Sequence, residues 1–183
     1  MPSIDELKSL ISTRNGLAVA NRYQVTFGLP AALKRIMPEA GTTSGQVLNL
    51  MCDAAGLPGR QIATVDYQAQ KQSIKIPYAF INEDVTFTFL LTGDYYAKKI
   101  FDAWSESIID FSGYRVKYLA DHVSDIRVFQ QVKGNNGDTI AYGIILKNAY
   151  PTTFSGIALD NASENTIQKY QVVMTYENFE VIK

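Results

Sequence analysis

Histidine and cysteine are almost missing from this chain, which holds one of each among its 183 residues. His122 and Cys52 stand far apart in the sequence, so a Cys/His or Ser/His/Asp nucleophile site would depend on a chance meeting in the fold. Transition-metal sites need clustered Cys, His or carboxylate ligands, and the sequence has no such spacing. We therefore predict no catalytic residue, no metal site and no cofactor. We expect His122 on the surface and Cys52 as a buried, inert thiol.

A surplus of one charge and a long apolar run are also missing. The chain has 17 Lys and Arg residues against 18 Asp and Glu residues, for a formal net charge of -1. Proteins that bind nucleic acid tightly usually carry a basic surplus or patch, so such binding is not expected. No stretch approaches the ~20 apolar residues of a membrane-spanning helix, and acidic residues near the N-terminus argue against a signal peptide. We expect no membrane anchor, and the single cysteine fits synthesis in a reducing cytoplasm.

Aromatic residues are abundant, with 11 Tyr and 9 Phe, and many stand in runs that alternate with polar residues. This period of two is typical of half-buried strands, as in Tyr23, Val25 and Phe27. The Asn136-Gly137 pair predicts a tight hairpin turn. The predicted strands cover residues 21–27, 46–52, 62–70, 72–80, 84–91, 125–132, 139–148 and 167–181.

Two features of the first third of the chain depart from simple alternation. Residues 46–52 are apolar almost throughout, which indicates a strand buried on both faces. Residues 28–45 contain two prolines and three glycines, which predicts a long loop with room for one helical turn.

Two helices are predicted from spacing and capping. Ser3 stands three residues before Glu6, which is the capping-box spacing, and Asn15-Gly16 is a stop signal. This first helix is short, so it needs a surface, either on its own domain or on a neighbouring subunit. The second helix covers residues 95–110, and we expect Trp104 to anchor it on the sheet.

A hairpin is predicted around residues 68–80. Ile74, Ile76, Tyr78 and Phe80 alternate with polar residues and are expected on one face. Pro77 lies within this run and cannot donate to a strand ladder, so it favours an edge strand or a projecting hairpin.

Together these elements predict a mainly β fold with one internal helix and an N-terminal helical arm. Residues 1–20 are expected to form the arm and residues 21–183 the β domain. We expect the arm and the hairpin to contact other subunits. The candidate contact residues are Ile4, Leu7, Leu10, Ile11, Ile74, Ile76 and Tyr78.

An ordered set of short motifs runs through the β domain. They are Asn21-Arg22-Tyr23-Gln24-Val25, residues 52–59, residues 84–89, Phe101-Asp102-Ala103-Trp104, residues 146–151, residues 157–160 and residues 167–172. This set resembles the tail tube proteins of contractile-tailed bacteriophages, the T4-type tail tube family, over about Asn21 to Val181. That family is related to the tubes of type VI secretion systems and pyocins.

The resemblance implies a tail-tube-like fold, which is a small β-barrel or sandwich flanked by the internal helix. It also implies a structural role in the virion tail, assembled in the cytoplasm of the bacterial host. It implies homohexameric rings that join sheets edge to edge and stack into a hollow tube inside the contractile sheath. The implied partners are copies of the chain itself and the tail sheath and baseplate proteins. Viral DNA would pass through the lumen without specific binding.

Two alternatives stay open at this point. The helix within residues 1–17 is not part of the family's core pattern, so the chain is compatible with a baseplate subunit that initiates the tube. A small-molecule-binding β domain or enzyme would instead show a deep pocket with converging polar groups.

Overall fold

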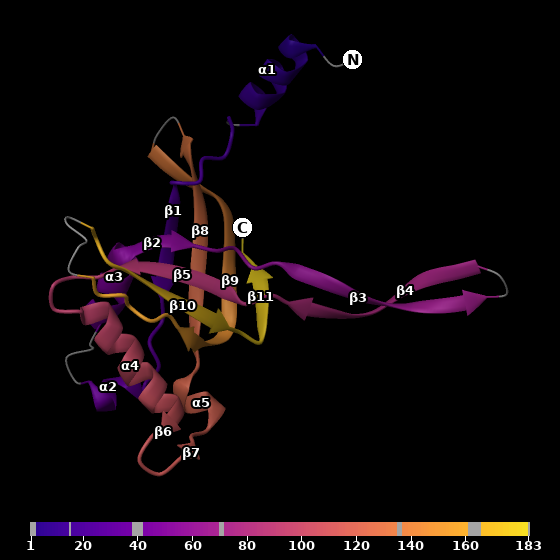
Figure 1. Cartoon of the computed structure of the whole chain (residues 1–183). Coiled ribbons are helices and arrows are strands. Elements are labelled where there is room, and N and C mark those ends of the chain that lie inside the picture. Colours follow the sequence, from indigo (N-terminus) through magenta and orange to yellow (C-terminus); the bar gives the residue numbers. More distant parts are fainter. Residues whose placement is uncertain are drawn as a thin grey trace.

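The structure is a computed structural model that describes residues 3–14, 16–37, 42–69, 72–134, 137–160 and 166–182. Its strands are β1 (Tyr23–Phe27), β2 (Cys52–Ala55), β3 (Arg60–Ala69), β4 (Gln72–Asn82), β5 (Val85–Leu90), β6 (Ile109–Asp110), β7 (Arg115–Val116), β8 (Ser124–Gly134), β9 (Gly137–Phe154), β10 (Lys169–Thr175) and β11 (Asn178–Val181). Its helices are α1 (Ile4–Thr13), α2 (Leu33–Ile36), α3 (Thr42–Met51), α4 (Tyr96–Ile108) and α5 (Leu119–His122). The predicted mainly β fold with a few helices is confirmed (Figure 1).

Seven strands form the body of the molecule in the order β1-β8-β9-β10-β5-β2, with β11 also pairing with β9. The long strand β9 serves two layers, because its first part pairs with β8 and β11 and its last part pairs with β10. Figure 1 shows β1, β8 and β9 standing alongside one another while β5 and β10 cross them. In the part of the chain that the structure describes, β1 and β2 end the order without pairing with each other. The barrel-or-sandwich prediction is therefore realised as two layers that share β9, and not as a closed barrel.

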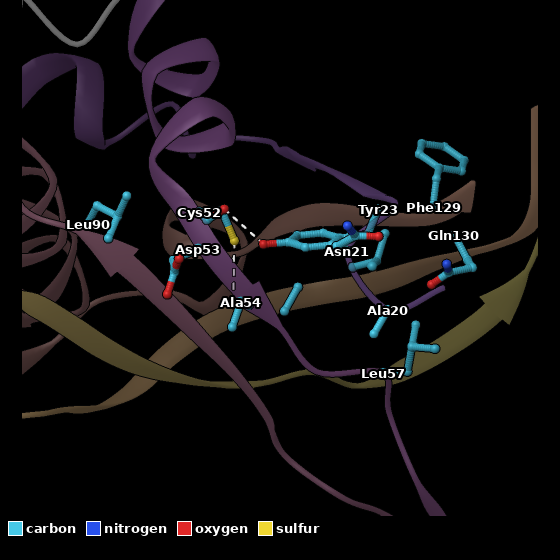
Figure 2. Close-up of a pocket in the computed structure, with 12 residues that line it drawn as sticks. Ala20, Asn21, Tyr23, Cys52, Asp53, Ala54, Leu57, Leu90, Phe129 and Gln130 are labelled. Atoms are coloured by element: carbon cyan, nitrogen blue, oxygen red, sulfur yellow. Dashed lines mark hydrogen bonds between the residues drawn. The ribbon is translucent and has the colours of Figure 1, made fainter. Parts of the chain in front are cut away.

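Side chains bridge the open seam between the end strands β1 and β2. The Tyr23 hydroxyl donates a hydrogen bond to the Cys52 carbonyl at 3.0 Å (Figure 2). The Phe27 N–H, also on the outer side of β1, donates to the Asn49 side chain of α3 at 2.9 Å. Individual side chains therefore bridge the seam, and no ladder of backbone hydrogen bonds joins the described residues of β1 and β2.

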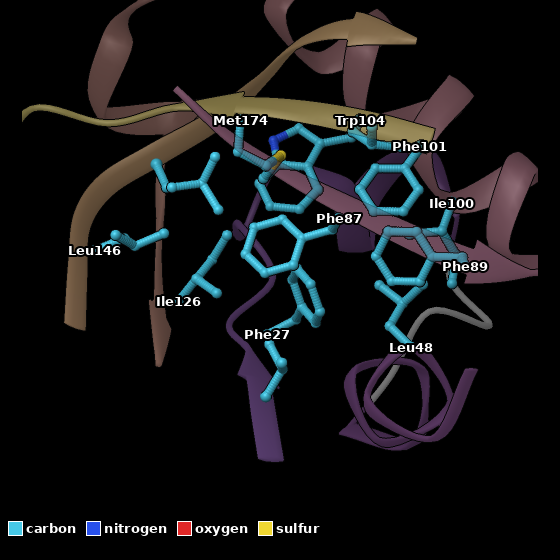
Figure 3. Packing of buried hydrophobic residues seen from close by; sticks show 14 of the residues in the cluster. Phe27, Leu48, Phe87, Phe89, Ile100, Phe101, Trp104, Ile126, Leu146 and Met174 are labelled. Atoms are coloured by element: carbon cyan, nitrogen blue, oxygen red, sulfur yellow. The ribbon is translucent and has the colours of Figure 1, made fainter. Parts of the chain in front are cut away.

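The core lies between the two layers and beneath α4 (Figure 3). Phe27 of one layer meets Phe87 and Phe89 of the other, with ring centroids 5.1 and 5.4 Å apart. α4 adds Phe101 and Trp104, whose parallel rings lie 6.0 Å apart and are fully buried. Each such side chain contributes about 1.5–3 kcal/mol on full burial. The predicted role of Trp104 as the anchor of its helix is confirmed.

The prediction of a strand at residues 46–52 is wrong, because Thr42–Met51 forms α3 and only Cys52 belongs to a strand. Burial follows helical spacing, with Leu48 fully buried and Leu50 81% exposed, whereas a strand buried on both faces would cover both. A short apolar run does not separate a buried strand from a helix, and Leu and Met favour helix. α3 thus begins inside the predicted loop, where α2 supplies the expected helical turn.

The last third of the chain matches its predicted pairing with one change. β8 and β9 form the predicted hairpin, with Gly134 opposite Gly137, although Asn136 of the expected turn lies outside the described residues. The predicted strand over residues 167–181 is divided into β10 and β11. The break at Tyr176 and Glu177 lets β10 pair with the end of β9 and β11 with its middle.

His122 is buried, not exposed as predicted, with only 4% of its surface accessible. It ends α5, and its ring lies edge-on to Tyr150 with centroids 5.7 Å apart. Its carbonyl accepts the Trp104 indole N–H at 2.7 Å, so the core anchor itself holds this turn in place. Among the described residues its Nδ1 has no hydrogen-bond partner. Burial lowers the pKa of His122 below its ordinary value of 6.5, although the Tyr118 carbonyl and Asp121 oppose the shift.

We predict that acidification destabilises the fold through His122. The unfolded chain takes up the proton more readily, so this stability is complete above about pH 6.5 and is lost as the pH falls from that value through the lower pKa of the folded state. Chemical unfolding at pH 7.5 and 5.5 should show a larger loss for the wild type than for His122→Gln. The single imidazole NMR resonance should titrate with a midpoint below 6.5. A midpoint above 6.5 would contradict the buried, neutral imidazole.

Candidate assembly interface

The most prominent feature outside the body is the ribbon formed by β3 and β4 (Figure 1). These two strands pair with each other and with no other described strand. Pro77 lies opposite Thr64, next to a register shift that leaves Tyr78 as an extra residue on β4. A proline without an N–H is tolerated in such a two-stranded ribbon. The projecting hairpin predicted from Pro77 is confirmed.

The bulge changes which residues share a face of this ribbon. Ile76 lies opposite Val65, whereas Phe80 lies opposite Ile62. Since neighbouring positions on β3 alternate between faces, Val65 and Ile62 point to opposite sides. The prediction that Phe80 shares a face with Ile74 and Ile76 is therefore wrong. The extra residue at Tyr78 shifts the alternation of β4 by one position.

One face of the ribbon is apolar and open to solvent. We call it the hairpin apolar face and define it by Val65, Tyr67, Ile74 and Ile76, which are 52%, 59%, 48% and 43% exposed. The opposite face carries polar pairs such as Asp66 with Lys75. Exposed apolar side chains grouped in this way make the face a candidate site of protein association. The sequence analysis missed Val65 and Tyr67. Their alternation with the polar residues Thr64 and Asp66 was the signal that could have found them.

The sheet margins form a second candidate surface. β1 pairs only with β8, β2 only with β5 and β11 only with β9, so each has one side without a described partner strand. In the layer β1-β8-β9-β11 every step is antiparallel. It follows that β1 and β11, at opposite ends of this layer, run in opposite directions. Open strand edges of this kind are ready to pair with another chain.

The seam between β1 and β2 widens into a groove of about 740 Å³ (Figure 2). Two of its polar side chains are engaged within the chain: Asp53 pairs with Lys169 at 2.7 Å, and the Gln130 amide donates to the Val19 carbonyl at 2.9 Å. The rest of its lining is mainly apolar: Ala20, Ala54, Ala55, Leu57, Leu90, Val128 and Phe129. This arrangement suits an apolar or extended chain segment better than a polar small molecule.

Cys52 borders the same groove. Burial, with a smaller effect from the Asp53 carboxylate, raises the pKa of the Cys52 thiol to about 12. The thiol is therefore protonated at neutral pH and is a poor nucleophile. The described ranges contain no cluster of three or more His, Cys, Asp or Glu residues that could hold a metal ion. None of the described helices is long and apolar enough to cross a membrane.

The N-terminal helix α1 is the third candidate surface. Its capping box is confirmed, since the Glu6 N–H donates to Ser3 Oγ at 3.2 Å and the Ser3 N–H donates to the Glu6 carboxylate at 2.8 Å. Gly16 stops the helix with a φ of 87° and an N–H bonded to the Ile11 carbonyl at 2.8 Å, while Asn15 lies outside the described residues. α1 buries none of its residues and stands away from the body (Figure 1).

The candidate contact residues fall into two groups. The structure brings Ile74 and Ile76 together on the hairpin apolar face and places the exposed Tyr78 at the bulge. It places the other four on α1, which Figure 1 shows far from the hairpin: Ile4, Leu7, Leu10 and Ile11. Their contacts with other subunits remain predictions.

Comparison with known proteins places this geometry in context. The family model described as phage tail tube protein matches residues 18–182. A search of curated proteins gave no significant match. The resemblance to tail tube proteins inferred from the sequence motifs is confirmed by the family match.

Several solved structures share the fold. One is a chain of the sheath-tube complex of an extracellular contractile injection system, PVC, in the extended state, with a TM-score of 0.61, 15% identity, and 99% of this chain and 98% of that chain covered. Another belongs to the baseplate of the anti-feeding prophage, with a TM-score of 0.62, 10% identity, and coverage of 91% and 95%. A third belongs to the tube-terminating cap of the anti-feeding prophage, with a TM-score of 0.60, 16% identity, and coverage of 90% of each chain.

We predict that Cys52 reacts slowly with a disulfide reagent while the protein is folded. A thiol with a pKa of about 12 is ionised in about one molecule in ten thousand at pH 8, against about a quarter for an ordinary cysteine. Stopped-flow labelling should be slower in buffer than in concentrated urea by on the order of a hundredfold or more. Equal rates in both would show that the thiol is exposed and ionised as in the unfolded chain.

Proposed function

The chain belongs to the phage tail tube protein family as a structural subunit of the tube, and from that premise we propose how it assembles. Six copies close into a ring by joining their sheet margins, and rings stack through the hairpins into a hollow tube. Viral DNA passes along the lumen without specific binding. The function needs no catalytic group. The observation that carries the proposal is a single chain with both open sheet margins and an exposed apolar hairpin.

The direction of the end strands supports closure into a ring. β1 and β11 are antiparallel, and rotation about an axis along the strands leaves their directions unchanged. A neighbour placed beside the layer therefore presents β11 antiparallel to β1, which continues the ladder across the contact. The groove between β1 and β2 leaves room for an extended segment beside β1. A head-to-tail contact of this kind closes into a ring when its rotation allows.

The hairpin apolar face supports stacking of rings. Figure 1 shows the ribbon reaching well beyond the body, which is the reach that a contact with an adjacent ring needs. Covering Val65, Tyr67, Ile74 and Ile76 removes their apolar surface from water, at about 25 cal/mol per Å². With six such contacts per ring, the free energies of burial would add at every junction between rings.

The similar structures suggest the further partners. One of them belongs to a sheath-tube complex and another to a baseplate, so we propose that this chain likewise contacts sheath and baseplate proteins in the tail. The near-neutral total charge of -1 is compatible with a lumen through which DNA slides. We place the assembled protein in the virion tail, built in the host cytoplasm.

The unpacked α1 helix favours a second role to be tested, that of a baseplate subunit that initiates the tube. An initiator would use residues 1–20 to bind other proteins, and its ring would stack on one side only. We propose these residues as an arm attached to a β domain at residues 21–183. In the tube role, the arm is dispensable for polymerisation.

Electron microscopy of the purified protein tests the proposal directly. We expect rings and tubes that lengthen with protein concentration. Monomers that persist at high concentration and at every salt concentration would contradict it.

Ile76→Asp is predicted to abolish stacking while it leaves the subunit folded. The change removes the burial of the exposed part of Ile76, about 1 kcal/mol at every hairpin contact, and adds a charge that must be desolvated. Circular dichroism and the unfolding midpoint should stay unchanged, because Ile76 is 43% exposed in the single chain. Ser73→Asp, on the polar face of the same strand, is the matched control and should still form tubes. Tubes of normal length from Ile76→Asp would exclude the hairpin apolar face from stacking.

Deletion of residues 1–17 is predicted to leave tube growth intact. α1 buries no side chain against the body, so its removal exposes no core. Tube length distributions for the full and shortened chains should agree in negative-stain images. Loss of tubes, with rings retained, would instead assign the arm to stacking.

A further inference from the structure

Arg60 stands at the first residue of β3, where the hairpin leaves the body. Its guanidinium donates through Nε to Asn82 Oδ1 at 3.1 Å and through Nη2 to Asn178 Oδ1 at 3.0 Å. Asn82 is the last residue of β4, and Asn178 is the first residue of β11. One side chain therefore joins both strands of the hairpin base to a margin of the body sheet.

Two aromatic rings hold the same guanidinium. Its central carbon lies 4.8 Å from the ring centroid of Phe80 on β4 and 4.3 Å from that of Phe179 on β11. The flat, always charged guanidinium can stack on rings while its edge donates hydrogen bonds, which a lysine cannot do. The bulge at Tyr78 is what brings Phe80 to the face of the ribbon that carries Arg60.

Further bonds tighten this junction. The Asn82 amide donates to the Glu177 carbonyl at 3.2 Å, in the turn between β10 and β11. The Glu83 N–H donates to the Gly59 carbonyl at 3.0 Å and closes the base of the hairpin. A Cβ at Gly59 would lie 2.2 Å from a Glu83 carboxylate oxygen, so the two chain segments pass too closely for a larger residue without a shift of that side chain.

The direction of the hairpin depends on this base, because β3 and β4 pair with no other described strand. Ten residues of β3 span about 33 Å at ~3.3 Å per residue, so a tilt of about 10° at the base moves the tip by about 6 Å. That displacement exceeds the ~4.8 Å spacing of adjacent strands and would carry the hairpin apolar face out of register with its target.

We propose that Arg60, with Asn82, Asn178, Phe80 and Phe179, forms a clasp that couples the two kinds of subunit contact. The inference rests on the proposed function. β11 is the margin that meets the neighbour within a ring, and the hairpin meets the adjacent ring. Because Arg60 joins the base of the hairpin to β11, ordering of β11 when the ring closes also fixes the direction in which the hairpin points, ready for stacking. Arg60 is a positioning residue, since it acts through the hairpin and need not touch the adjacent ring.

The test compares Arg60→Ala with the wild type and with Arg115→Ala, an exposed arginine on β7 with no part in the clasp. Sedimentation velocity and negative-stain images count rings and tubes over a range of concentrations. Arg60→Ala should keep its rings while the concentration needed for tubes rises by about tenfold or more. Arg60→Lys should fall between, because it keeps one donor and loses the fork and the stacking. Arg115→Ala should match the wild type.

A purely structural role would lower the unfolding midpoint and remove rings and tubes together, and that result would overturn the proposal. So would tubes from Arg60→Ala at the wild-type concentration. If Arg60→Ala fails to fold, Asn178→Ala removes one acceptor and leaves the arginine. It should show the same separation of rings from tubes to a smaller extent, and wild-type tube formation by it would equally overturn the clasp. A wild type that forms neither rings nor tubes would count against the proposed function instead.

Discussion

The N–H and C=O groups along the margin of a β-sheet need hydrogen-bond partners. In the described part of this subunit the end strands of the body, β1, β2 and β11, each have a strand on one side only. The Asn49 side chain of α3 accepts one N–H of β1, and the Tyr23 hydroxyl donates to the Cys52 carbonyl, but these single bonds do not make a strand ladder. The hairpin apolar face also needs a partner, because its apolar side chains are exposed to water. A second copy of the chain would supply what both features need, and this is the physical basis of the assembly that we propose.

The groups that usually carry chemistry serve structural ends in this fold. Cys52 is held as a protonated thiol beside the seam, and its carbonyl accepts the Tyr23 hydroxyl. His122 is neutral and buried, and its carbonyl positions Trp104, around which α4 packs on the sheet. Each contributes more through its backbone oxygen than through its reactive side chain.

Sequence patterns predicted the elements whose neighbours impose a single periodicity. β1 and β5 follow strict alternation, α1 follows its capping box, and the Trp104 helix follows its apolar stripe. The failures have physical causes of longer range. Leu48 lies in a run compatible with either helix or strand, and Phe80 changes face because of one extra residue at the bulge. The Arg60 bond to Asn178 joins residues 118 positions apart, so no local sequence pattern could predict it.

The most direct test of this account is a cryo-electron microscopy map of the protein assembled from purified subunits. The account predicts closed rings in which backbone ladders run between neighbouring copies along the sheet margins, with Val65 and Ile76 buried against the next ring. A map in which each subunit covers its own margins, or in which the hairpin apolar face stays in solvent between rings, would contradict it.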